Sequence, residues 1–494
     1  MELFCINQFL EGKTIFISGA TGYLAKILTE KILRLQPHVK RLYLLIRAPN
    51  SNSAKERFNN EVLSNYYMIS SKEKLGPDLH GFIEEKVFPV AGDIACDGDS
   101  LGINSELKDE MCREIDIIVN SAATTRFDER YRILRAFCKY DTAIRINTLG
   151  AVNVVKFSKQ CTKLKMLLHV STACVCSERE GLILEKPLNY GETLNGSSRL
   201  DIDVEKKLVE ETLKDLQGRN ATEKEVTLAM RILGIERLHG WPNTYTFTKA
   251  MGGMLLGHLK EDLQLIILRP TIILSTYKEP FPGWIEGYRG VDTFIVGYGK
   301  GKQNVAQVCI SYVIPADMVV NSVIAAMVTH RVPSSHTAVY HISSSRRNQL
   351  KLGDVVQFVV DYFKKNPWID ERGKPIKVKK FHLLDSTASL HKYIAIRYMP
   401  ILNILKLANL ILFQYLQAVS TTLERSINRA IRLAELHKPY ALFKGIFDDT
   451  NAEILRMATR EINADDTFNF DPRTIQWENY LKEIHIPGLV KYIF

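Results

Sequence analysis

The sequence predicts an α/β protein with a doubly wound parallel sheet, a substrate-binding extension and a smaller helical C-terminal domain. A buried strand, a glycine turn and a helix follow one another at the N-terminus, and strand and helix patterns alternate as far as about residue 375. Beyond that point only helical patterns remain. We therefore expect a sheet-containing domain over residues 1–375 and a helical domain over residues 385–494.

The composition of the 494 residues is that of a globular protein, with 46% hydrophobic and 24% charged residues, and it excludes a disordered or collagen-like chain. A mean hydropathy of -0.08 argues against a polytopic membrane protein. The net charge of +10 suits an anionic ligand or membrane surface, but no nucleic-acid-binding motif accompanies it, so we expect no nucleic acid partner. The sequence indicates no particular oligomeric state.

The cysteine content indicates a reducing compartment. Eight cysteines are scattered along the chain without a Cys-x-x-Cys pair, and no pair of histidines completes a metal-binding set. We therefore expect no metal site. No secretory signal precedes the first strand, so we also expect the mature chain to begin at its own first domain.

The first predicted strand, residues 14–18, is followed by a glycine turn and a helix over residues 26–35. The turn glycines let backbone N–H groups approach a pyrophosphate at the helix N-terminus, and Ala25 takes the place of the usual third glycine. A tight turn without a ligand is the alternative, but the strand before it and the helix after it favour nucleotide binding. The cofactor-binding residues expected here are Gly19, Thr21, Gly22, Tyr23 and Leu24.

The second predicted strand, residues 41–46, ends at Arg47. An acidic residue there would bind the ribose hydroxyls of NAD, whereas an arginine can pair with a 2′-phosphate, so NADPH is the expected cofactor. An arginine in contact only with solvent is the alternative. A third strand over residues 86–94 contains Asp93, which is either a hydrogen-bond acceptor near the adenine or a turn-forming residue.

Two further predicted strands end in small or hydroxyl-bearing residues. In residues 116–123, Asn120 and Ala122 allow close approach of the cofactor ribose. Residues 165–173 bring Thr172 to the same edge of the sheet. A hydroxyl at a strand end is often only a cap for the next turn. Here it can instead donate a hydrogen bond to a substrate carbonyl.

The sequence also places a phenol beside an ammonium. Tyr245 and Lys249 lie one turn apart in a segment with helical spacing of its apolar residues. A nearby cation lowers a phenol pKa of about 10 and makes the tyrosine a usable proton donor. The pair alone is weak evidence, because an exposed pair on an amphipathic helix has the same spacing.

Taken together, these motifs resemble an extended short-chain dehydrogenase/reductase, which is a Rossmann-type enzyme. Motifs along nearly the whole chain are similar to those of the alcohol-forming fatty acyl-CoA reductases, in particular the plant ones. These further motifs lie at residues 127–131, 239–245, 269–271, 279–287, 314–319, 444–449 and 485–488.

The resemblance implies that Thr172 is the catalytic hydroxyl, Tyr245 the proton donor and Lys249 its partner, with Asn147 supporting a water relay behind them. It also implies that Tyr245 and Lys249 bind the cofactor, with Lys249 holding the nicotinamide ribose. It implies that NADPH reduces a long-chain or very-long-chain fatty acyl-CoA to a primary fatty alcohol through an aldehyde, with release of CoA. Such a reaction belongs to lipid and wax biosynthesis. The location implied is the cytosolic face of the endoplasmic reticulum membrane, with peripheral attachment, or the cytoplasm.

Three alternatives remain open. The same chemistry can stop at the aldehyde, or the protein can be an epimerase or hydroxysteroid dehydrogenase of the same superfamily. A non-catalytic NADP-binding partner protein is the third alternative. Two departures from the family pattern keep it open, because residues 132–140 look longer than usual and residues 301–309 look shortened and altered.

A final feature is the apolar segment 398–413 in the helical domain. Asn403, Lys406 and Asn409 recur at every third position and interrupt it, so it is a poor membrane-spanning helix. An amphipathic helix in a membrane interface, or over an acyl tunnel, fits this polar stripe. A helix buried in the small domain is the alternative.

Overall fold

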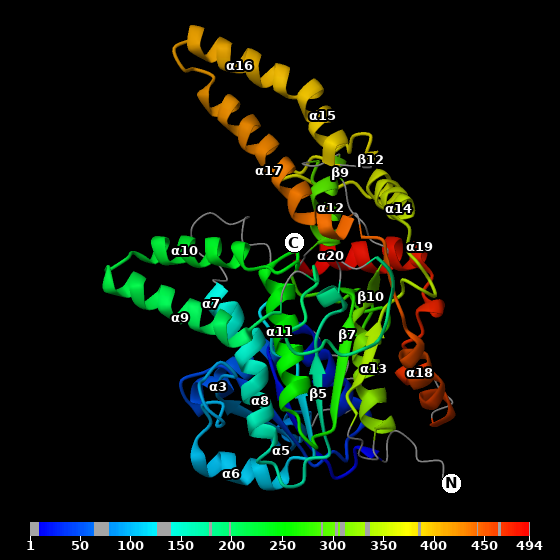
Figure 1. Cartoon of the computed structure of the whole chain (residues 1–494). Helices are drawn as coiled ribbons and strands as arrows, with labels where there is room; N and C mark the ends of the chain where they lie inside the picture. Colours follow the sequence, from blue (N-terminus) through cyan, green and yellow to red (C-terminus); the bar gives the residue numbers. More distant parts are fainter. Residues whose placement is uncertain are drawn as a thin grey trace. The chain divides into compact units, whose positions relative to one another are not determined.

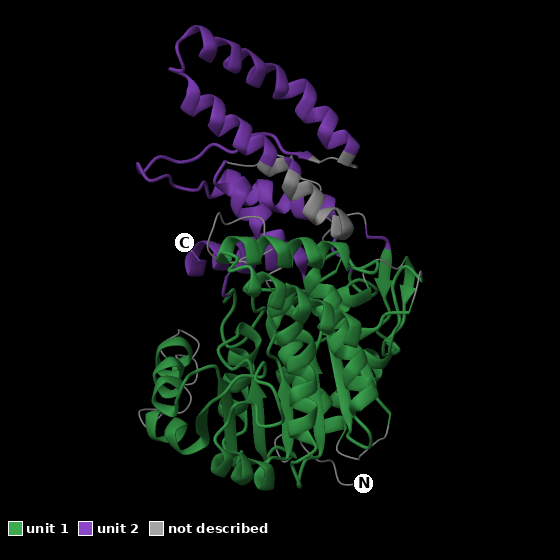
Figure 2. Cartoon of the chain, turned by 60° about the vertical axis from the view of Figure 1, so that its left-hand side comes forward, with its two compact units in different colours: residues 1–285, 312–348, 445–475 green, residues 286–311, 349–444, 476–494 purple. Residues whose placement is uncertain are grey.

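The computed structural model describes most of the chain and divides it into two compact units (Figure 2). Unit 1 comprises residues 1–285, 312–348 and 445–475, and unit 2 comprises residues 286–311, 349–444 and 476–494. The chain thus crosses between the units several times, and this division does not coincide with a single boundary near residues 375–385. The described residues are 9–63, 79–125, 140–176, 180–196, 199–287, 290–301, 305–306, 312–330, 336–383, 387–441, 443–462 and 466–493.

Unit 1 is built on a seven-stranded parallel sheet in the order β11-β7-β5-β4-β1-β2-β3. Figure 1 labels its strands β5 and β7, beside helices α11 and α13. The strand order reverses at β1, which is the arrangement of a doubly wound sheet with a ligand crevice at the reversal point. The predicted fold class is therefore confirmed. The strands are β1 (Thr14–Ser18), β2 (Arg41–Ile46), β3 (Val87–Ala91), β4 (Ile117–Asn120), β5 (Met166–Val170), β7 (Leu265–Pro270) and β11 (Ala338–Ile342).

The strands are runs of buried apolar residues because helices cover both faces of the sheet. β1 and β7 are buried along their entire length. Helices α8 and α11 pack together, and so do α2 and α13. The helices of unit 1 are α2 (Tyr23–Leu35), α3 (Ser51–Phe58), α5 (Leu79–Lys86), α6 (Ser105–Glu114), α7 (Tyr140–Ala143), α8 (Gly150–Ser158), α9 (Ile202–Gly218), α10 (Glu223–Glu236), α11 (Thr244–Leu259), α13 (Ala316–Thr329) and α18 (Thr450–Ile462).

Segment 445–475 belongs to unit 1 although it lies near the end of the chain. Its strand β13 (Gly445–Phe447) pairs with β6 (Gly181–Ile183). The carboxylate of Glu185 then accepts hydrogen bonds from the backbone N–H groups of Asn451 and Ala452, the first turn of α18. A helix N-terminus offers unsatisfied donors to such an acceptor, but burial has the larger effect and raises the pKa of Glu185 to about 8.

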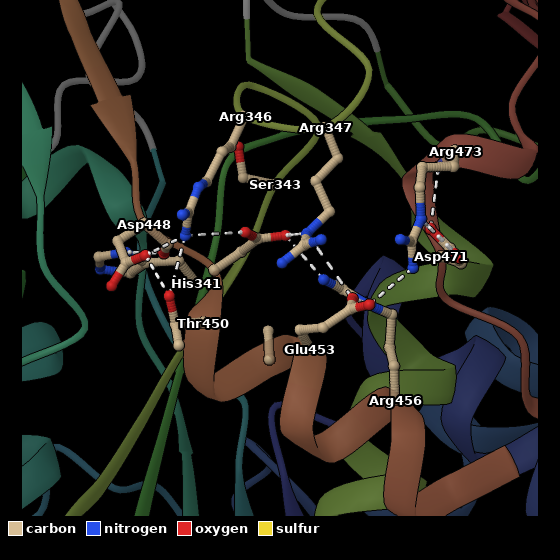
Figure 3. Close-up of polar contacts among 12 residues, drawn as sticks. His341, Ser343, Arg346, Arg347, Asp448, Thr450, Glu453, Arg456, Asp471 and Arg473 are labelled. Carbon is tan, nitrogen blue, oxygen red and sulfur yellow. Dashed lines mark hydrogen bonds and ion pairs between the residues drawn. The ribbon is translucent and has the colours of Figure 1, made fainter.

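A cluster of ion pairs also fastens this segment to the loop after β11 (Figure 3). Arg346 pairs with Asp448 at 2.5 Å, and Arg347 pairs with Asp449 at 2.6 Å. Asp449 is buried and also pairs with the buried Arg456 of α18 at 2.7 Å. These contacts explain why the chain returns to the sheet after the helices of unit 2.

Unit 2 is mainly helical, as predicted for the C-terminal region. Helices α15 and α16 are bent by 40° relative to each other, and both pack against α17. Leu390, Ile394, Leu402 and Ile427 are buried between them. The elements of unit 2 are α12 (Val291–Gly299), β9 (Val305–Ala306), α14 (Leu352–Lys365), β12 (His382–Leu383), α15 (Thr387–Arg397), α16 (Met399–Ile411), α17 (Gln417–Ala441), α19 (Trp477–Asn479) and α20 (Ile486–Ile493).

Candidate active site

The glycine turn after β1 is shaped for close contact with a ligand. Gly19 has φ +72°, and a Cβ there would lie 2.7 Å from the Cα of Ala122, so only glycine fits. Gly22 is the N-cap of α2 and has no side-chain cap. The first turn of α2 contains no acidic residue. The N–H groups of this helix N-terminus point out of the helix, and together with the helix dipole they can receive a pyrophosphate.

A cavity of about 230 Å³ lies against this turn. Arg47 and Arg57 lie on its wall, and Arg57 is held in place by Glu61 at 2.6 Å and by the Arg47 carbonyl, to which it donates. Two guanidinium groups suit a phosphate ester in addition to a pyrophosphate. The other lining residues are Gly19, Thr21, Gly22, Leu45, Gly92, Asp93, Ile94, Ser121, Ala122, Ala123 and Ile146.

The structure brings six of the predicted cofactor residues to this cavity: Gly19, Thr21, Gly22, Arg47, Asp93 and Ala122. Asp93 lines the cavity and also accepts a hydrogen bond from the backbone N–H of Ala95 at 2.9 Å, as a turn-forming residue does. Its role as an acceptor near the adenine stays a prediction. Arg57 was not predicted. It lies on α3, and nothing in the sequence around it indicates that this helix turns back to the end of β2.

Five predicted cofactor residues do not line the cavity, namely Tyr23, Leu24, Asn120, Tyr245 and Lys249. The Tyr23 hydroxyl donates to the carbonyl of Trp284 at 2.6 Å, and the two rings meet edge to face. Leu24 is half-buried on α2. Asn120 lies inside the sheet, where its side chain bridges Ser18 and His169.

Lys249 lies fully buried on α11 at the end of β5. Its Nζ donates to the carbonyl of Val170 at 2.9 Å and lies 3.3 Å from Nε2 of His169. Burial lowers the pKa of Lys249 to about 7, because an ammonium without solvent is costly. The lysine is therefore poised between its charged and neutral forms near neutral pH, as a proton-transfer group requires.

Tyr245 lies one turn before Lys249 and is half-buried, as the spacing predicts. The Asn243 side chain caps this helix by accepting from the Thr246 N–H at 3.0 Å. Thr172 follows β5, and its hydroxyl accepts from the Cys174 N–H at 3.2 Å and donates to the Pro270 carbonyl at 3.4 Å. The hydroxyl thus caps the next turn in this structure, and its proposed contact with substrate stays a prediction.

Asn147 lies on η2 (Ile144–Leu149), a π-helical turn. Its side chain bonds both the N–H and the carbonyl of Thr124, at 2.9 and 3.1 Å, and donates to Thr248 Oγ1 at 3.0 Å. Helix α11 can pass close by because Gly252 faces the Asn147 carbonyl, where a Cβ would lie 2.3 Å away. Asn147 therefore ties the loop after β4 to the helix of Tyr245 and Lys249.

Several expectations fall on residues that the structure does not describe. Residues 132–139 and the motif at 127–131 lie outside the described part of the chain, as do 302–304 and 307–309. Within the described part, no three His, Cys, Asp or Glu side chains gather as a metal site would require.

Comparisons with known proteins find relatives along the whole chain. Two protein-family models, both described as male sterility protein, match residues 17–323, as an NAD-binding domain, and residues 398–494. The chain is 47% identical over 502 residues to fatty acyl-CoA reductase 1 of Arabidopsis thaliana. It is 46% identical over 501 residues to the alcohol-forming fatty acyl-CoA reductase of Simmondsia chinensis. Each match covers 100% of this chain and 99% of the relative.

Solved structures support the fold. The terminal R domain from the myxalamid biosynthetic pathway superposes with a TM-score of 0.55 at 16% identity and covers 97% of this chain and 91% of that one. The reductase domain of a nonribosomal peptide synthetase from Mycobacterium tuberculosis gives a TM-score of 0.54 at 18% identity, with 97% and 93% covered.

Proposed function

The chain belongs to the plant-type fatty acyl-CoA reductases, and on this basis we propose that it reduces a long-chain or very-long-chain fatty acyl-CoA to a primary fatty alcohol with NADPH. The observation that carries the proposal is the buried Lys249 at the end of β5, with Tyr245 one turn away on the same helix. This arrangement supplies a proton donor, Tyr245, and a cation, Lys249, that lowers the pKa of the donor.

When bound, the nicotinamide cofactor supplies hydride to the carbonyl carbon, once to the thioester and once, from a second molecule, to the aldehyde. Tyr245 donates a proton to the carbonyl oxygen in each reduction, and Thr172 holds that oxygen. After the first reduction, the hydroxyl proton of the hemithioacetal moves to sulfur as the C–S bond breaks, which releases CoA and the aldehyde. Lys249 favours the phenolate of Tyr245 and holds the nicotinamide ribose.

The test is product analysis with purified protein, NADPH and acyl-CoAs of several chain lengths. We expect primary alcohol from the wild type and none from a folded Tyr245→Phe variant. Accumulated aldehyde without alcohol would show that the reaction stops after one reduction. A folded protein that binds NADPH without oxidising it in the presence of acyl-CoA would overturn the reductase assignment and favour a non-catalytic partner protein.

We also propose NADPH over NADH. Arg47 and Arg57 on one cavity wall support this choice, because guanidinium groups bind a 2′-phosphate well. No carboxylate stands at the end of β2, where NAD-dependent enzymes of this fold bind the ribose hydroxyls.

We further propose that helices α15, α16 and α17, here called the C-terminal hairpin, contact a membrane surface at the cytosolic face of the endoplasmic reticulum. The polar stripe of α16 faces α17, since Lys406 donates to Glu424 at 2.6 Å and Asn409 donates to Gln417 at 2.6 Å. The apolar residues consequently face outward. The exposed ones are Ile396, Met399, Ile401, Ile404, Leu407, Leu410, Ile411, Leu412, Phe413, Tyr415 and Val419.

The degree of exposure favours a lipid surface over a buried helix. Phe413 is 96% exposed and Leu410 is 77% exposed at the turn between α16 and α17. Contiguous apolar surface of this kind marks an interaction site. Residues 387–441 contain seven Lys or Arg and two Glu, so their charge complements anionic headgroups. Among the described helices none is long and apolar enough to span a bilayer alone, and α15 with α16 meets that criterion only as a bent pair.

Flotation of the full chain with phosphatidylcholine vesicles, with and without phosphatidylserine, tests this proposal. We expect wild type to float, more so with phosphatidylserine, and the double variant Leu410→Asp, Phe413→Asp to lose at least about tenfold in binding, because each exposed apolar side chain contributes about 1.5–3 kcal/mol when buried. Leu228→Asp, at another exposed apolar position, is the matched control. Equal flotation of the double variant and wild type would refute membrane contact through the hairpin and favour a cytoplasmic location.

A further inference from the structure

A line of hydrogen-bonding side chains crosses three neighbouring strands and ends at the active-site lysine. Ser18 on β1 donates to Asn120 Oδ1 at 2.7 Å. Asn120 on β4 lies directly opposite His169 on β5, and its amide nitrogen Nδ2 is 3.1 Å from His169 Nδ1. The other imidazole nitrogen, Nε2, lies 3.3 Å from Lys249 Nζ. All four side chains are buried, so solvent does not supply further hydrogen-bond partners to them.

His169 is neutral in this position. Burial and, after it, the charges of Lys249 and Arg269 hold its pKa well below the ordinary value. A neutral imidazole has one N–H donor and one lone-pair acceptor, and the partner of one nitrogen decides the state of the other. If Nδ1 carries the proton and donates to Asn120, then Nε2 is an acceptor for the lysine. If Nδ1 accepts from Asn120, then Nε2 presents an N–H group to the lysine.

The lysine has few other partners. Apart from Nε2 of His169, the contact that the structure gives its Nζ is the carbonyl of Val170, whereas an ammonium has three protons to place. An acceptor at Nε2 stabilises the ammonium, and an N–H at Nε2 would oppose it. The structure turns the Asn120 NH₂ group toward Nδ1 and its oxygen toward Ser18. A half-turn of the amide places the oxygen at Nδ1 and the NH₂ group at Ser18 Oγ, and the two orientations occupy equivalent positions.

We propose that His169 is a positioning residue for the catalytic lysine: its neutral imidazole accepts a hydrogen bond from the Lys249 ammonium through Nε2. In this arrangement the Asn120 amide is turned so that its oxygen accepts from Nδ1–H, which fixes the tautomer, and its NH₂ group donates to Ser18 Oγ. The inference deepens the proposed function, because it concerns the charge state of the lysine that the proposed reaction uses. The pairing in the structure does not itself depend on the substrate.

The surroundings of the pair contain few other charges. Arg269 on β7 is the other charged group that acts on His169, and its guanidinium donates to the Lys186 carbonyl at 2.8 Å. On the side of α11, Tyr245 is the titratable group one turn from the lysine. Burial disfavours the ammonium of Lys249, and an acceptor at His169 Nε2 compensates for part of this cost.

The experiment measures the pKa of Lys249 in the full chain without cofactor or substrate. Urea unfolding over a range of pH is compared between proteins with Lys249 and with Lys249→Met, in three backgrounds: wild type, His169→Leu and His169→Gln. The pH dependence of the difference reports the lysine titration. We expect His169→Leu to lower the pKa by about one unit, since a hydrogen bond to a charged group contributes about tenfold or more in an equilibrium constant. His169→Gln, whose carbonyl oxygen can replace Nε2 as acceptor, should restore it.

A second readout is the pH profile of kcat/KM, whose alkaline limb should move to lower pH by about the same one unit in His169→Leu and return in His169→Gln. An unchanged lysine pKa in His169→Leu, or equal behaviour of the leucine and glutamine variants, would overturn the proposal. If leucine prevents folding, His169→Met removes the acceptor with an unbranched side chain and gives the same comparison. A wild type without reductase activity would refute the proposed function, whereas the unfolding titration would still decide the role of His169.

Discussion

Replacing Lys249 by methionine should make the folded protein more stable at neutral pH while it abolishes the proposed reaction. Lys249 is 1% exposed, and burial lowers its pKa from 10.5 to about 7. The unfolded chain therefore binds a proton more tightly than the folded one. For a lysine with a lowered folded pKa, the cost to stability is fully present below pH 7 and is relieved as the pH rises toward 10.5.

The size of this cost follows from the two pKa values. At pH 7 it amounts to about 4 kcal/mol, and it falls by about 2 kcal/mol between pH 7 and pH 9. Between pH 6 and pH 7 it changes by less than about 0.5 kcal/mol. The methionine variant also loses the hydrogen bond to the Val170 carbonyl. This loss lowers its free energy of unfolding by about 1–3 kcal/mol at every pH and offsets part of the gain in stability. The change with pH, and not the absolute value, therefore identifies the lysine.

The assay is urea unfolding of wild type and Lys249→Met at pH 6, 7, 8 and 9, monitored by circular dichroism, with Lys163→Met as a control at an exposed lysine. The stability of the methionine variant relative to wild type should be nearly constant from pH 6 to 7 and then decline. The exposed control should show no such trend. A difference between wild type and Lys249→Met that is independent of pH would refute the reasoning, because it would mean that the buried lysine titrates as it does in the unfolded chain.

Three further predictions concern the cofactor cavity and the return segment. Arg57→Gln should raise the KM for NADPH by about tenfold or more and leave the KM for NADH nearly unchanged, because a charge-assisted hydrogen bond contributes about 1.5–3 kcal/mol; equal effects on both cofactors would contradict a 2′-phosphate contact. Gly19→Ala should abolish NADPH binding, measured by cofactor fluorescence, because its φ is +72° and a Cβ would lie 2.7 Å from backbone; near-normal affinity would contradict the close approach. Asp449→Asn should lower the free energy of unfolding by about 3 kcal/mol, because it leaves the buried Arg456 without one of its carboxylate partners, whereas Asp262→Asn at an exposed position should change it little. Asp449→Asn unfolding like wild type in urea would show that the ion-pair cluster contributes little.

The local sequence predicted the position of the glycine turn and the helical spacing of Tyr245 and Lys249. The turn of Gly19 and Gly22 follows from strand, glycine spacing and helix within one short stretch, and the structure confirms it beside a cavity. The one-turn spacing of Tyr245 and Lys249 likewise depends only on helix geometry. Such features need no knowledge of which distant segments meet.

The parts that depend on distant contacts were not predictable. Strand β11 pairs with β7, about 70 residues earlier, and β13 of the segment 445–475 pairs with β6 across more than half of the chain. No local pattern assigns either strand to unit 1. The fifth strand was expected to run to residue 173 but ends at Val170, and a 3₁₀ turn follows, because Thr172 caps that turn. Tyr23 was expected at the cofactor and instead packs on Trp284, from a loop far along the chain.

The C-terminal hairpin shows why an amphipathic pattern alone leaves the direction of a helix open. Asn403, Lys406 and Asn409 define one polar stripe on α16, and in a soluble protein such a stripe faces water. In the structure Lys406 and Asn409 instead donate hydrogen bonds to Glu424 and Gln417 of α17. The apolar side is then left outside, as it would be if lipid were its neighbour. The helix that binds the polar residues, and not their spacing, therefore decides which face of α16 is left open to another surface such as lipid.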